Sequence, residues 1–441
     1  MLKALEQENK KELADYLAGR AYEISADTLL ATNAILADVR NRKDQALKDY
    51  TEKFDGVLLN QLRVDPQEIE EQAAKADPFF VQSLEEAAEN IRFFHEAQKQ
   101  HGYHLEKEDG IYLGQRVLPI ANIGIYVPGG RALYPSSVLM NAIPARIAGV
   151  KRIVMVTPPS READGRLAPN LAAAARAAGV DEIYTVGGAQ AVAALAYGTE
   201  SIAPVDKIVG PGNMYVAAAK KLVFGKVDID MIAGPSEILV IADEKASPAH
   251  VAADLLSQAE HDPMASAILV STSRELIEAV NRELRKQTDA LPKKEIIEQS
   301  LASFGTSILA GSIEEAIEIS NEIAPEHLEL QIEKARDYLD LVTNAGSVFL
   351  GYTTCESIGD YFGGTNHVLP TSQTARFSSA LSVDAFIKKS SYLYYPDSAL
   401  QKHGKKIIKM AEEENLEGHA NAIRVRMKEK TAKAAGKEES R

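Results

Sequence analysis

The chain has 441 residues, of which 45% are hydrophobic and 25% charged, so it is long enough for two or more globular domains. The chain has 63 acidic and 49 basic residues, and this acidic balance argues against nucleic acid as the main partner. The one cysteine, Cys355, excludes an intrachain disulfide and a cysteine-based metal site within one chain. The N-terminal stretch lacks an apolar signal core, and no apolar run is long enough to span a bilayer, so a cytoplasmic enzyme or binding protein with no membrane partner is expected.

Helical periodicity dominates the first 100 residues. We expect helices over 31–55 and 84–100, and between them a capped helix that begins at Asp65-Pro66. Residues 1–24 are expected to form an N-terminal helical arm.

From about residue 110, apolar strands alternate with helices. The predicted strands are 152–159, 182–188, 206–213, 237–243 and 266–273, with helices between them. This alternation is typical of parallel sheets covered by helices on both faces. It predicts an α/β fold with two Rossmann-like parallel-sheet domains, one discontinuous (25–125 and 237–380) and one formed by 126–236.

Beyond residue 380 the chain again becomes helical and charged. Within 407–430 we expect a helix, a break at Gly418-His419 and a second helix, whereas 431–441 is expected to be a frayed or disordered tail. Long polar helices outside an α/β body suggest arms that reach another subunit. Residues 381–430 are therefore expected to be a helical dimerisation arm.

Nine histidines allow each to be considered in turn. Five of them occur in polar stretches without a partner pattern, and we expect them on the surface: His95, His101, His104, His250 and His403.

The segment 248–263 reads as an amphipathic helix with an unusual end. Gln258 and His261 are three residues apart, which places an amide and an imidazole on one helix face. Such a pair could bind a metal ion or a substrate, because imidazole is the commonest metal ligand. The spacing alone favours the alternative, a histidine that satisfies the carbonyl groups at the helix end.

Glu326 and His327 follow Pro325, which is expected to start a helix. A carboxylate in a first helical turn is favoured by the helix dipole, and two adjacent titratable groups could share acid and base duties. A capping glutamate beside a packing histidine is an equally weighted alternative.

Three further stretches place polar groups in loops or helix breaks. Asp360 and His367 lie in Gly- and Asn-rich loops, which bring backbone close to a ligand but also simply form tight turns. Glu414 and His419 flank Gly418, whose alternative role is a helix C-cap. Amide, imidazole and carboxylate ligands together would suit Zn²⁺ or Mn²⁺, although spacing cannot prove that they meet.

Loops also follow several predicted strands, at 186–190, 209–213 and 233–237. Ligands of open parallel sheets bind beyond the carboxyl ends of the strands, so these loops could line one crevice. None of them contains the dinucleotide fingerprint, a P-loop or a nucleophile elbow. The loops therefore predict a ligand crevice without naming the ligand.

Taken together, many unusual motifs in order closely resemble the histidinol dehydrogenase family, from about residue 25 to 428. The matching segments are 126-YVPGG-130, 187-GGAQAVAALAYGTE-200, 206-DKIVGPGN-213, 233-AGPSEILVIAD-243, 254-DLLSQAEHDP-263, 325-PEHLEL-330, 346-GSVFLG-351, 359-GDY-361, 364-GTNHVLPT-371 and 418-GHANAIRVR-426. The family needs no cysteine nucleophile at the position of Cys355.

The resemblance implies the last step of histidine biosynthesis. L-Histidinol is oxidised by four electrons to L-histidine through L-histidinaldehyde, with reduction of two NAD⁺. It also implies a zinc-dependent homodimer with intertwined arms.

The resemblance carries residue roles as well. Glu326 and His327 are expected to be catalytic. Zinc is expected on Gln258, His261, Asp360 and His419. Substrate contacts are expected from Ser236, His367, Glu414, His327 and the zinc ligands, with His419 and Glu414 donated by the second subunit. NAD contacts are expected from Tyr126, Gln190 and Asn213.

Two other functions are compatible with the residues alone. A zinc hydrolase of small amides would use the same glutamate and metal and require no nicotinamide. A metabolite-binding protein would bind zinc and histidinol without turnover.

Overall fold

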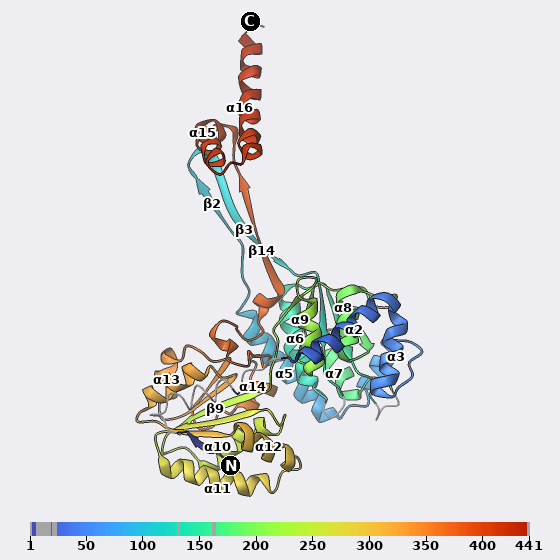
Figure 1. Ribbon diagram of the computed structural model, residues 1–441, viewed down its shortest axis with the longest axis vertical. Coiled ribbons are helices and arrows are strands. Elements are labelled where there is room, and N and C mark those ends of the chain that lie inside the picture. The colour runs from blue at the N-terminus through green and yellow to red at the C-terminus, as the bar shows by residue number, and fades with distance from the viewer. Residues whose placement is uncertain (1, 6–18, 20–23, 130–132, 161–164, 439–441) are drawn as a thin grey trace. The chain divides into compact units, whose positions relative to one another are not determined.

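The computed structural model describes residues 2–5, 19, 24–129, 133–160 and 165–438 (Figure 1). The chain forms two compact units. The first comprises Met1–Lys99 and Ile120–Phe386, and the second comprises Gln100–Pro119 and Ile387–Arg441.

A five-stranded parallel sheet of the first unit has the order β6-β5-β4-β7-β8. Its strands are β4 (Asn122–Tyr126), β5 (Arg152–Thr157), β6 (Glu182–Thr185), β7 (Lys207–Val209) and β8 (Asp228–Ile229). The connecting helices are α6 (Pro135–Ala148), α7 (Pro169–Ala178), α8 (Gly188–Tyr197) and α9 (Met214–Val223). Ile153 and Met155 pack with α6 and α7, whereas Val154 and Val156 pack with α8 and α9. Helices therefore cover both faces, which confirms the predicted α/β fold and explains the continuous apolar strands.

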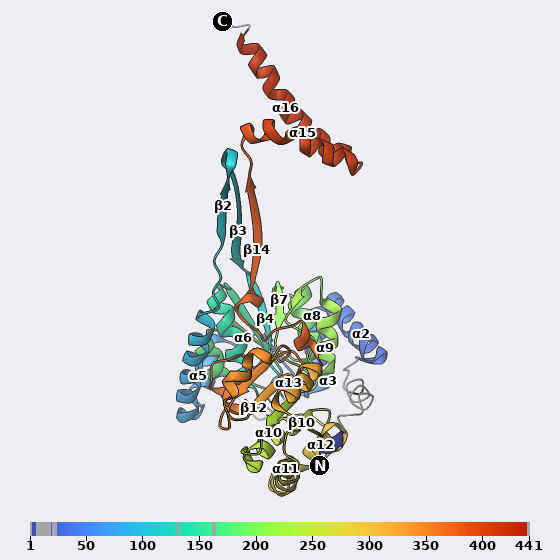
Figure 2. The same ribbon diagram turned by 90° about the vertical axis from the view of Figure 1, so that its left-hand side faces the viewer.

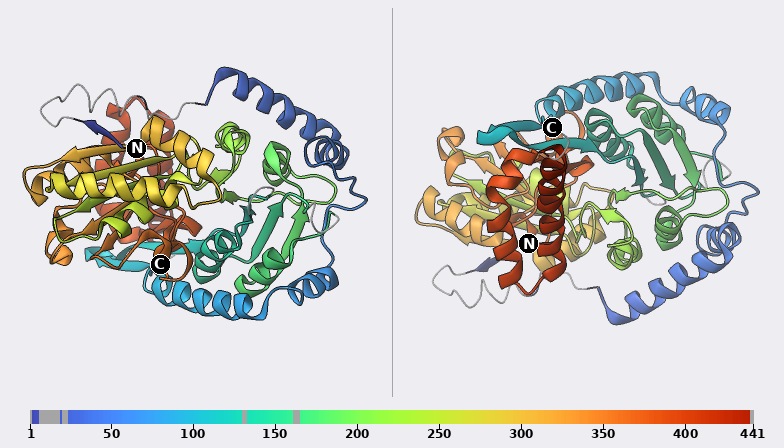
Figure 3. Two further views of the ribbon diagram at one scale, coloured as in Figure 1. Left: turned by 90° about the horizontal axis from the view of Figure 1, so that it is seen from below. Right: turned by 90° about the horizontal axis from the view of Figure 1, so that it is seen from above.

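The N-terminal helices pack against the helices that cover this five-stranded sheet. They are α2 (Ala26–Arg42), α3 (Asp44–Asp55), α4 (Pro66–Ala73) and α5 (Pro78–Glu96). Leu36 and Leu47 join the α8 side of the core, and Leu84 and Ile91 join the α6 side, so these helices flank the green lobe in Figure 3. The sequence-based grouping of 25–125 with 237–380 is thus wrong for these helices.

Local predictions in this region are mostly confirmed. The side chain of Asp65 accepts a hydrogen bond from Gln67 N at 2.8 Å and caps α4 as expected. The helix expected over 31–55 is divided into α2 and α3 at Lys43, whose φ of 49° breaks the helical backbone.

A six-stranded parallel sheet forms the other part of the first unit, in the order β1-β11-β10-β9-β12-β13. Its strands are β1 (Lys3–Leu5), β9 (Glu237–Ala242), β10 (Ser266–Ser271), β11 (Thr306–Leu309), β12 (His327–Gln331) and β13 (Ser347–Leu350). Helices α10 (Pro248–Ala259), α11 (Arg274–Thr288) and α12 (Lys294–Phe304) cover one face, and α13 (Ile313–Ile323) covers the other (Figure 1). Because β1 is a strand, the expected helical arm is wrong for residues 3–5, and most of 1–24 lies outside the described residues.

The polar end of α10 is placed by this connectivity. A crossover helix runs back antiparallel to the strands that it joins, so α10 ends near the amino ends of β9 and β12. A further short helix, α14 (Glu356–Tyr361), follows β13. Single 3₁₀ turns occur at Ala335–Leu341, Thr374–Arg376 and Val383–Phe386.

The second unit combines an antiparallel sheet with two helices. Strands β2 (Tyr103–Lys107), β3 (Ile111–Pro119) and β14 (Ile387–Tyr394) lie side by side in the order β14-β3-β2 (Figure 2), with a 3₁₀ turn at Glu108–Gly110. Helices α15 (Asp397–Glu413) and α16 (Glu417–Glu438) are separated at Asn415, whose φ is 57°, so the break precedes Gly418. Helix α16 reaches into the segment expected to be frayed, and 439–441 lie outside the described residues. No described helix is both long and apolar enough to cross a membrane.

Candidate active site

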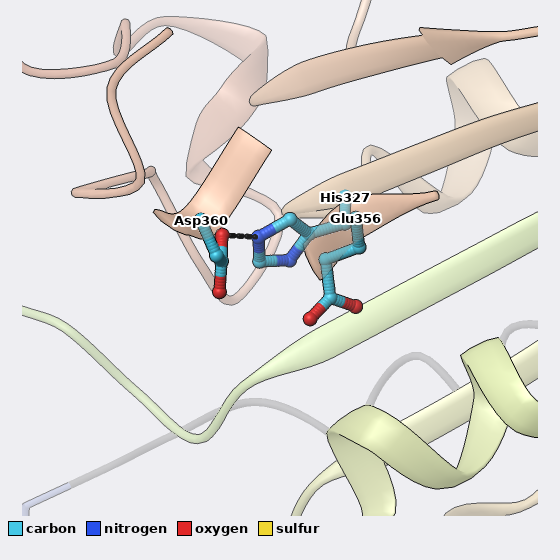
Figure 4. Close-up of side chains that lie close together, drawn as sticks. All are labelled: His327, Glu356 and Asp360. Atoms are coloured by element: carbon cyan, nitrogen blue, oxygen red, sulfur yellow. Dashed lines mark ion pairs between the residues drawn. The ribbon is translucent and has the colours of Figure 1, made fainter. Parts of the chain in front are cut away.

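His327 is the first residue of β12 and the centre of a buried polar cluster (Figure 4). Its Nδ1 lies 3.0 Å from the carbonyl oxygen of Glu237, and its Nε2 lies 3.5 Å from Asp360 Oδ1. Because Nδ1 donates to a backbone carbonyl, Nε2 is the ring nitrogen left for proton transfer. Burial alone lowers the pKa of His327, but the carboxylates of Glu326, Glu356 and Asp360 raise it well above its usual value.

Glu326 immediately precedes this strand and, like His327, contacts the backbone of Glu237. Its Oε2 accepts a hydrogen bond from Glu237 N at 2.9 Å and lies 3.6 Å from His327 Nδ1. Burial raises the pKa of Glu326 to about 8, although the charge of His327 and the Glu237 N–H lower it. The expected helix at Pro325 is wrong, since α13 ends at Ile323 and Ala324 adopts a left-handed φ of 49°. Glu326 therefore binds a neighbouring strand and does not cap a helix.

Asp360 reaches His327 from α14, and so does Glu356 one turn earlier (Figure 4). One ligand atom from each of His327, Glu356 and Asp360 lies within 4.8 Å of the others, an arrangement able to hold a metal ion. Burial raises the pKa of Glu356 to about 7, whereas hydrogen bonding and charge from His327 outweigh burial and lower the pKa of Asp360. Sequence reasoning missed Glu356, although its four-residue spacing from Asp360 was a usable signal.

Gln258 brings its amide from α10 into the same cluster. Its Nε2 lies 3.4 Å from His327 Nδ1, and its Oε1 is buried without a hydrogen-bond partner among the described residues. His261 lies just beyond α10, with Nδ1 3.5 Å from Ser236 Oγ. His261 is an exposed residue, yet desolvation lowers the pKa of its imidazole against the opposing charge of Asp360.

His367 joins the cluster from the loop after α14. Its Nδ1 donates to the carbonyl oxygen of Asp360 at 2.9 Å, and its Nε2 lies 3.2 Å from Ser137 Oγ on α6. Burial lowers the pKa of His367. The imidazole thus connects Asp360 with the helices of the five-stranded sheet.

The expected ligands Gln258, His261 and Asp360 offer an amide oxygen, an imidazole and a carboxylate, donor types that zinc accepts, and Gln258 Oε1 is buried without a partner among the described residues. The group of His and carboxylate atoms that lies within 4.8 Å is His327, Glu356 and Asp360, so His261 is not part of it. The fourth expected ligand, His419, and the expected substrate contact Glu414 are exposed residues of the second unit.

The expected cofactor residues lie at the carboxyl ends of the five-stranded sheet. Tyr126 ends β4, and its Oη accepts a hydrogen bond from Gly188 N at 3.0 Å. Gln190 lies in the first turn of α8, with its Oε1 buried and without a partner in the described part of the chain. Asn213 caps α9 through bonds from Tyr215 N and Val216 N of 3.0 and 3.2 Å. Gln190 and Asn213 thus lie on two of the three loops expected to line a ligand crevice.

The third predicted loop, 233–237, lies between β8 and the amino end of β9. Its Ser236 therefore lies at the amino end of a strand, as do Glu326 and His327 at β12. A cavity of about 480 Å³ lined by Val205 and Phe224 lies away from this cluster, so convergence of polar groups, and not cavity volume, locates the site.

The remaining histidines also test the predictions. His101, His104 and His250 are exposed as expected, and His403 is half-buried, 3.5 Å from Asp109. The expectation for His95 is wrong: it is fully buried on α5, where its Nδ1 donates to the carbonyl oxygen of Ile91 at 2.8 Å.

Known proteins match almost the whole chain. The model of the family described as histidinol dehydrogenase matches residues 20–427. A histidinol dehydrogenase of Listeria monocytogenes is 54% identical over 396 residues, which cover 90% of this chain and 92% of that protein. One of Clostridium acetobutylicum is 54% identical over 92% of this chain and 93% of its own. The crystal structure of histidinol dehydrogenase from Elizabethkingia anophelis superposes with a TM-score of 0.91 at 42% identity, covering 98% of this chain and 99% of that one. The chain therefore belongs to the histidinol dehydrogenase family of oxidoreductases.

Proposed function

We propose that the protein oxidises L-histidinol to L-histidine through L-histidinaldehyde, with one zinc ion per subunit and two NAD⁺ reduced per substrate. The observation that carries the proposal is the convergence of Glu326 and His327 with Gln258 and Asp360 in one buried cluster. Family membership favours an oxidoreductase over a zinc hydrolase or a non-catalytic binding protein.

The metal would be held by Gln258, His261 and Asp360, with His419 contributed by a second subunit. When bound, zinc would supply a positive centre that orients the imidazole and amine of the substrate. Ser236 and His367, which contact His261 and Asp360, would bind the substrate beside it. Glu414 would join them from the second subunit.

His327 would take the hydroxyl proton at Nε2 as the carbinol carbon loses hydride to NAD⁺. Two features of the site suit that role. Nδ1 is held by the carbonyl oxygen of Glu237, and Asp360 lies next to Nε2 to stabilise the protonated ring. During hydration of the aldehyde the protonated ring would return this proton to the carbonyl oxygen, so that the same atom could accept the proton of the second oxidation.

Glu326 would act between the two oxidations. The aldehyde must take up water before it can lose a second hydride, and Glu326 would remove a proton from that water. Burial raises the pKa of Glu326 to about 8. A carboxylate with a pKa near the working pH is a far stronger base than an ordinary one.

NAD⁺ would bind at Tyr126, Gln190 and Asn213 without the dinucleotide fingerprint. Gln190 Oε1, which is buried without a partner among the described residues, offers an acceptor at this crevice, and a cofactor group could displace the Asn213 side chain from Tyr215 N and Val216 N.

A homodimer completes the proposal. Leu113 pairs in register with Leu105 on one side and Leu393 on the other, and these side chains are 38%, 57% and 62% exposed. An exposed apolar row on the unit that carries Glu414 and His419 fits a surface covered by a second copy.

The decisive experiment is the stoichiometry of reduced nicotinamide with limiting L-histidinol and excess NAD⁺, with and without a chelator. Two reduced cofactors per histidinol, lost on chelation and restored by zinc, are expected. One per histidinol would mean that the aldehyde is released and would contradict the role of Glu326.

A further inference from the structure

Strand β12 carries a face on which every residue is polar and buried. Alternate residues of a strand point to the same side, so His327, Glu329 and Gln331 share one face. They are 3%, 0% and 2% exposed, whereas Leu328 and Leu330 point into the apolar core beneath α13. Burial of a carboxyl group is costly unless its oxygens are hydrogen-bonded, so the partners of Glu329 show what it supports.

Both oxygens of Glu329 have a partner. Oε1 accepts a hydrogen bond from Glu356 N at 2.8 Å, and Oε2 accepts one from Gln331 Nε2 at 2.8 Å. Glu356 is the first residue of α14, and its N-cap residue, Cys355, makes no side-chain capping bond. The backbone N–H at the start of α14 therefore finds its acceptor on strand β12 and not on its own N-cap residue.

Helix α14 carries site groups one turn apart. Glu356 and Asp360 are four residues apart and both face His327 (Figure 4). In a helix of 6 residues, a shift of the first turn moves the whole element, including Asp360.

The same polar layer extends to the helix that carries Gln258. Gln331 Nε2 also donates to Asp254 Oδ2 at 2.7 Å, and Asp254 lies on α10 one turn before Gln258. Glu329 and Gln331 thus link β12 to α10, which carries Gln258, and to α14, which carries Asp360.

We propose that Glu329 is a positioning residue of the site, which holds α14 against β12 so that Asp360 stays within reach of His327 and of the metal. The inference rests on the proposed zinc site. Groups that orient metal ligands change metal affinity without touching the ion.

The test compares the zinc dissociation constant, measured by competition with a chromophoric chelator, in wild type and four variants. Glu329→Met and Glu329→Ala remove both acceptors, and either one suffices if the other does not fold. Glu329→Gln keeps a carbonyl oxygen for Glu356 N. Leu330→Ala creates a cavity on the opposite face of the same strand and controls for general destabilisation.

We expect Glu329→Met or Glu329→Ala to weaken zinc binding about 10- to 100-fold and to lower kcat/KM for L-histidinol, with KM for NAD⁺ unchanged. Glu329→Gln should recover most of the affinity, and Leu330→Ala should lower only the melting temperature. The inference would be overturned if Glu329→Met and Glu329→Ala bound zinc with wild-type affinity. It would also be overturned if Leu330→Ala lost as much zinc affinity as they do. Failure of the wild type to bind zinc would instead refute the proposed zinc site, and the inference with it.

Discussion

Glu326 Oε2 lies 3.6 Å from His327 Nδ1 and accepts a hydrogen bond from the backbone N–H of Glu237 at 2.9 Å. The two candidate catalytic residues are adjacent in sequence, and each has its own hydrogen bond to strand β9. The backbone carbonyl of Glu237 takes the other bond, from His327 Nδ1. The backbone of Glu237 thus orients both side chains, which suits different proposed roles for Glu326 and His327.

Glu326→Gln should separate the two oxidations. Loss of the base should slow hydration of the aldehyde about 10²- to 10⁴-fold while alcohol oxidation survives. The yield of reduced nicotinamide should fall from two to about one per L-histidinol within the time of the first oxidation. Glu318→Gln, an exposed change on α13, serves as the control. Normal two-fold yield in Glu326→Gln would remove Glu326 from the mechanism.

Cross-subunit donation of His419 can be tested by complementation. His327→Asn and His419→Asn should each abolish turnover alone. Co-expressed, they should form mixed dimers in which one of the two sites has both histidines, giving about a quarter of wild-type activity for random pairing. Light scattering would verify the dimer, and absence of any recovery in verified mixed dimers would place His419 and His327 in the same subunit's site.

Gly188→Ala should weaken NAD⁺ binding selectively. Gly188 has a φ of 66°, and an added Cβ would lie 2.5 Å from Gln190 Oε1. Displacement of Gln190 should raise KM for NAD⁺ about tenfold, the effect of about 1.4 kcal/mol, and leave zinc content unchanged. Gly225→Ala has a similar strain, with a φ of 95°, but meets no atom within 4 Å. Steady-state kinetics of both variants should show the KM effect only at Gly188.

His95 should make stability depend on pH. Burial lowers its pKa below 6.5, so the unfolded chain binds a proton that the folded chain does not. Its contribution is therefore fully present above the unfolded pKa and is lost as pH falls from about 6.5 toward the lower folded pKa. His95→Gln should have a lower melting temperature at pH 7.5 but a shallower decline toward pH 5. Exposed His250→Gln provides the comparison, and parallel slopes for wild type and His95→Gln would contradict a buried neutral imidazole.

The sequence predicted local structure correctly where residues close together in the chain determine it. The Asp65-Pro66 cap of α4 and the strand over Arg152–Thr157 depend on short-range bonds and on apolar periodicity. The helix over Pro248–Ala259 also follows from apolar periodicity, although it ends before His261, the residue expected on the same helix face as Gln258. The family motifs added the expectation that these residues belong to one site.

The sequence by itself therefore determined the α/β class, most elements, the family and the residue types available for a site. Tertiary structure decided that Pro325 leads into a strand, because the residues after it pair with β9 on one side and β13 on the other in the six-stranded sheet. It also buried His95, packed α2–α5 against the helices of the five-stranded sheet and brought Glu356 beside His327. These outcomes depend on which distant surfaces bury one another, and local periodicity carries no information about that choice.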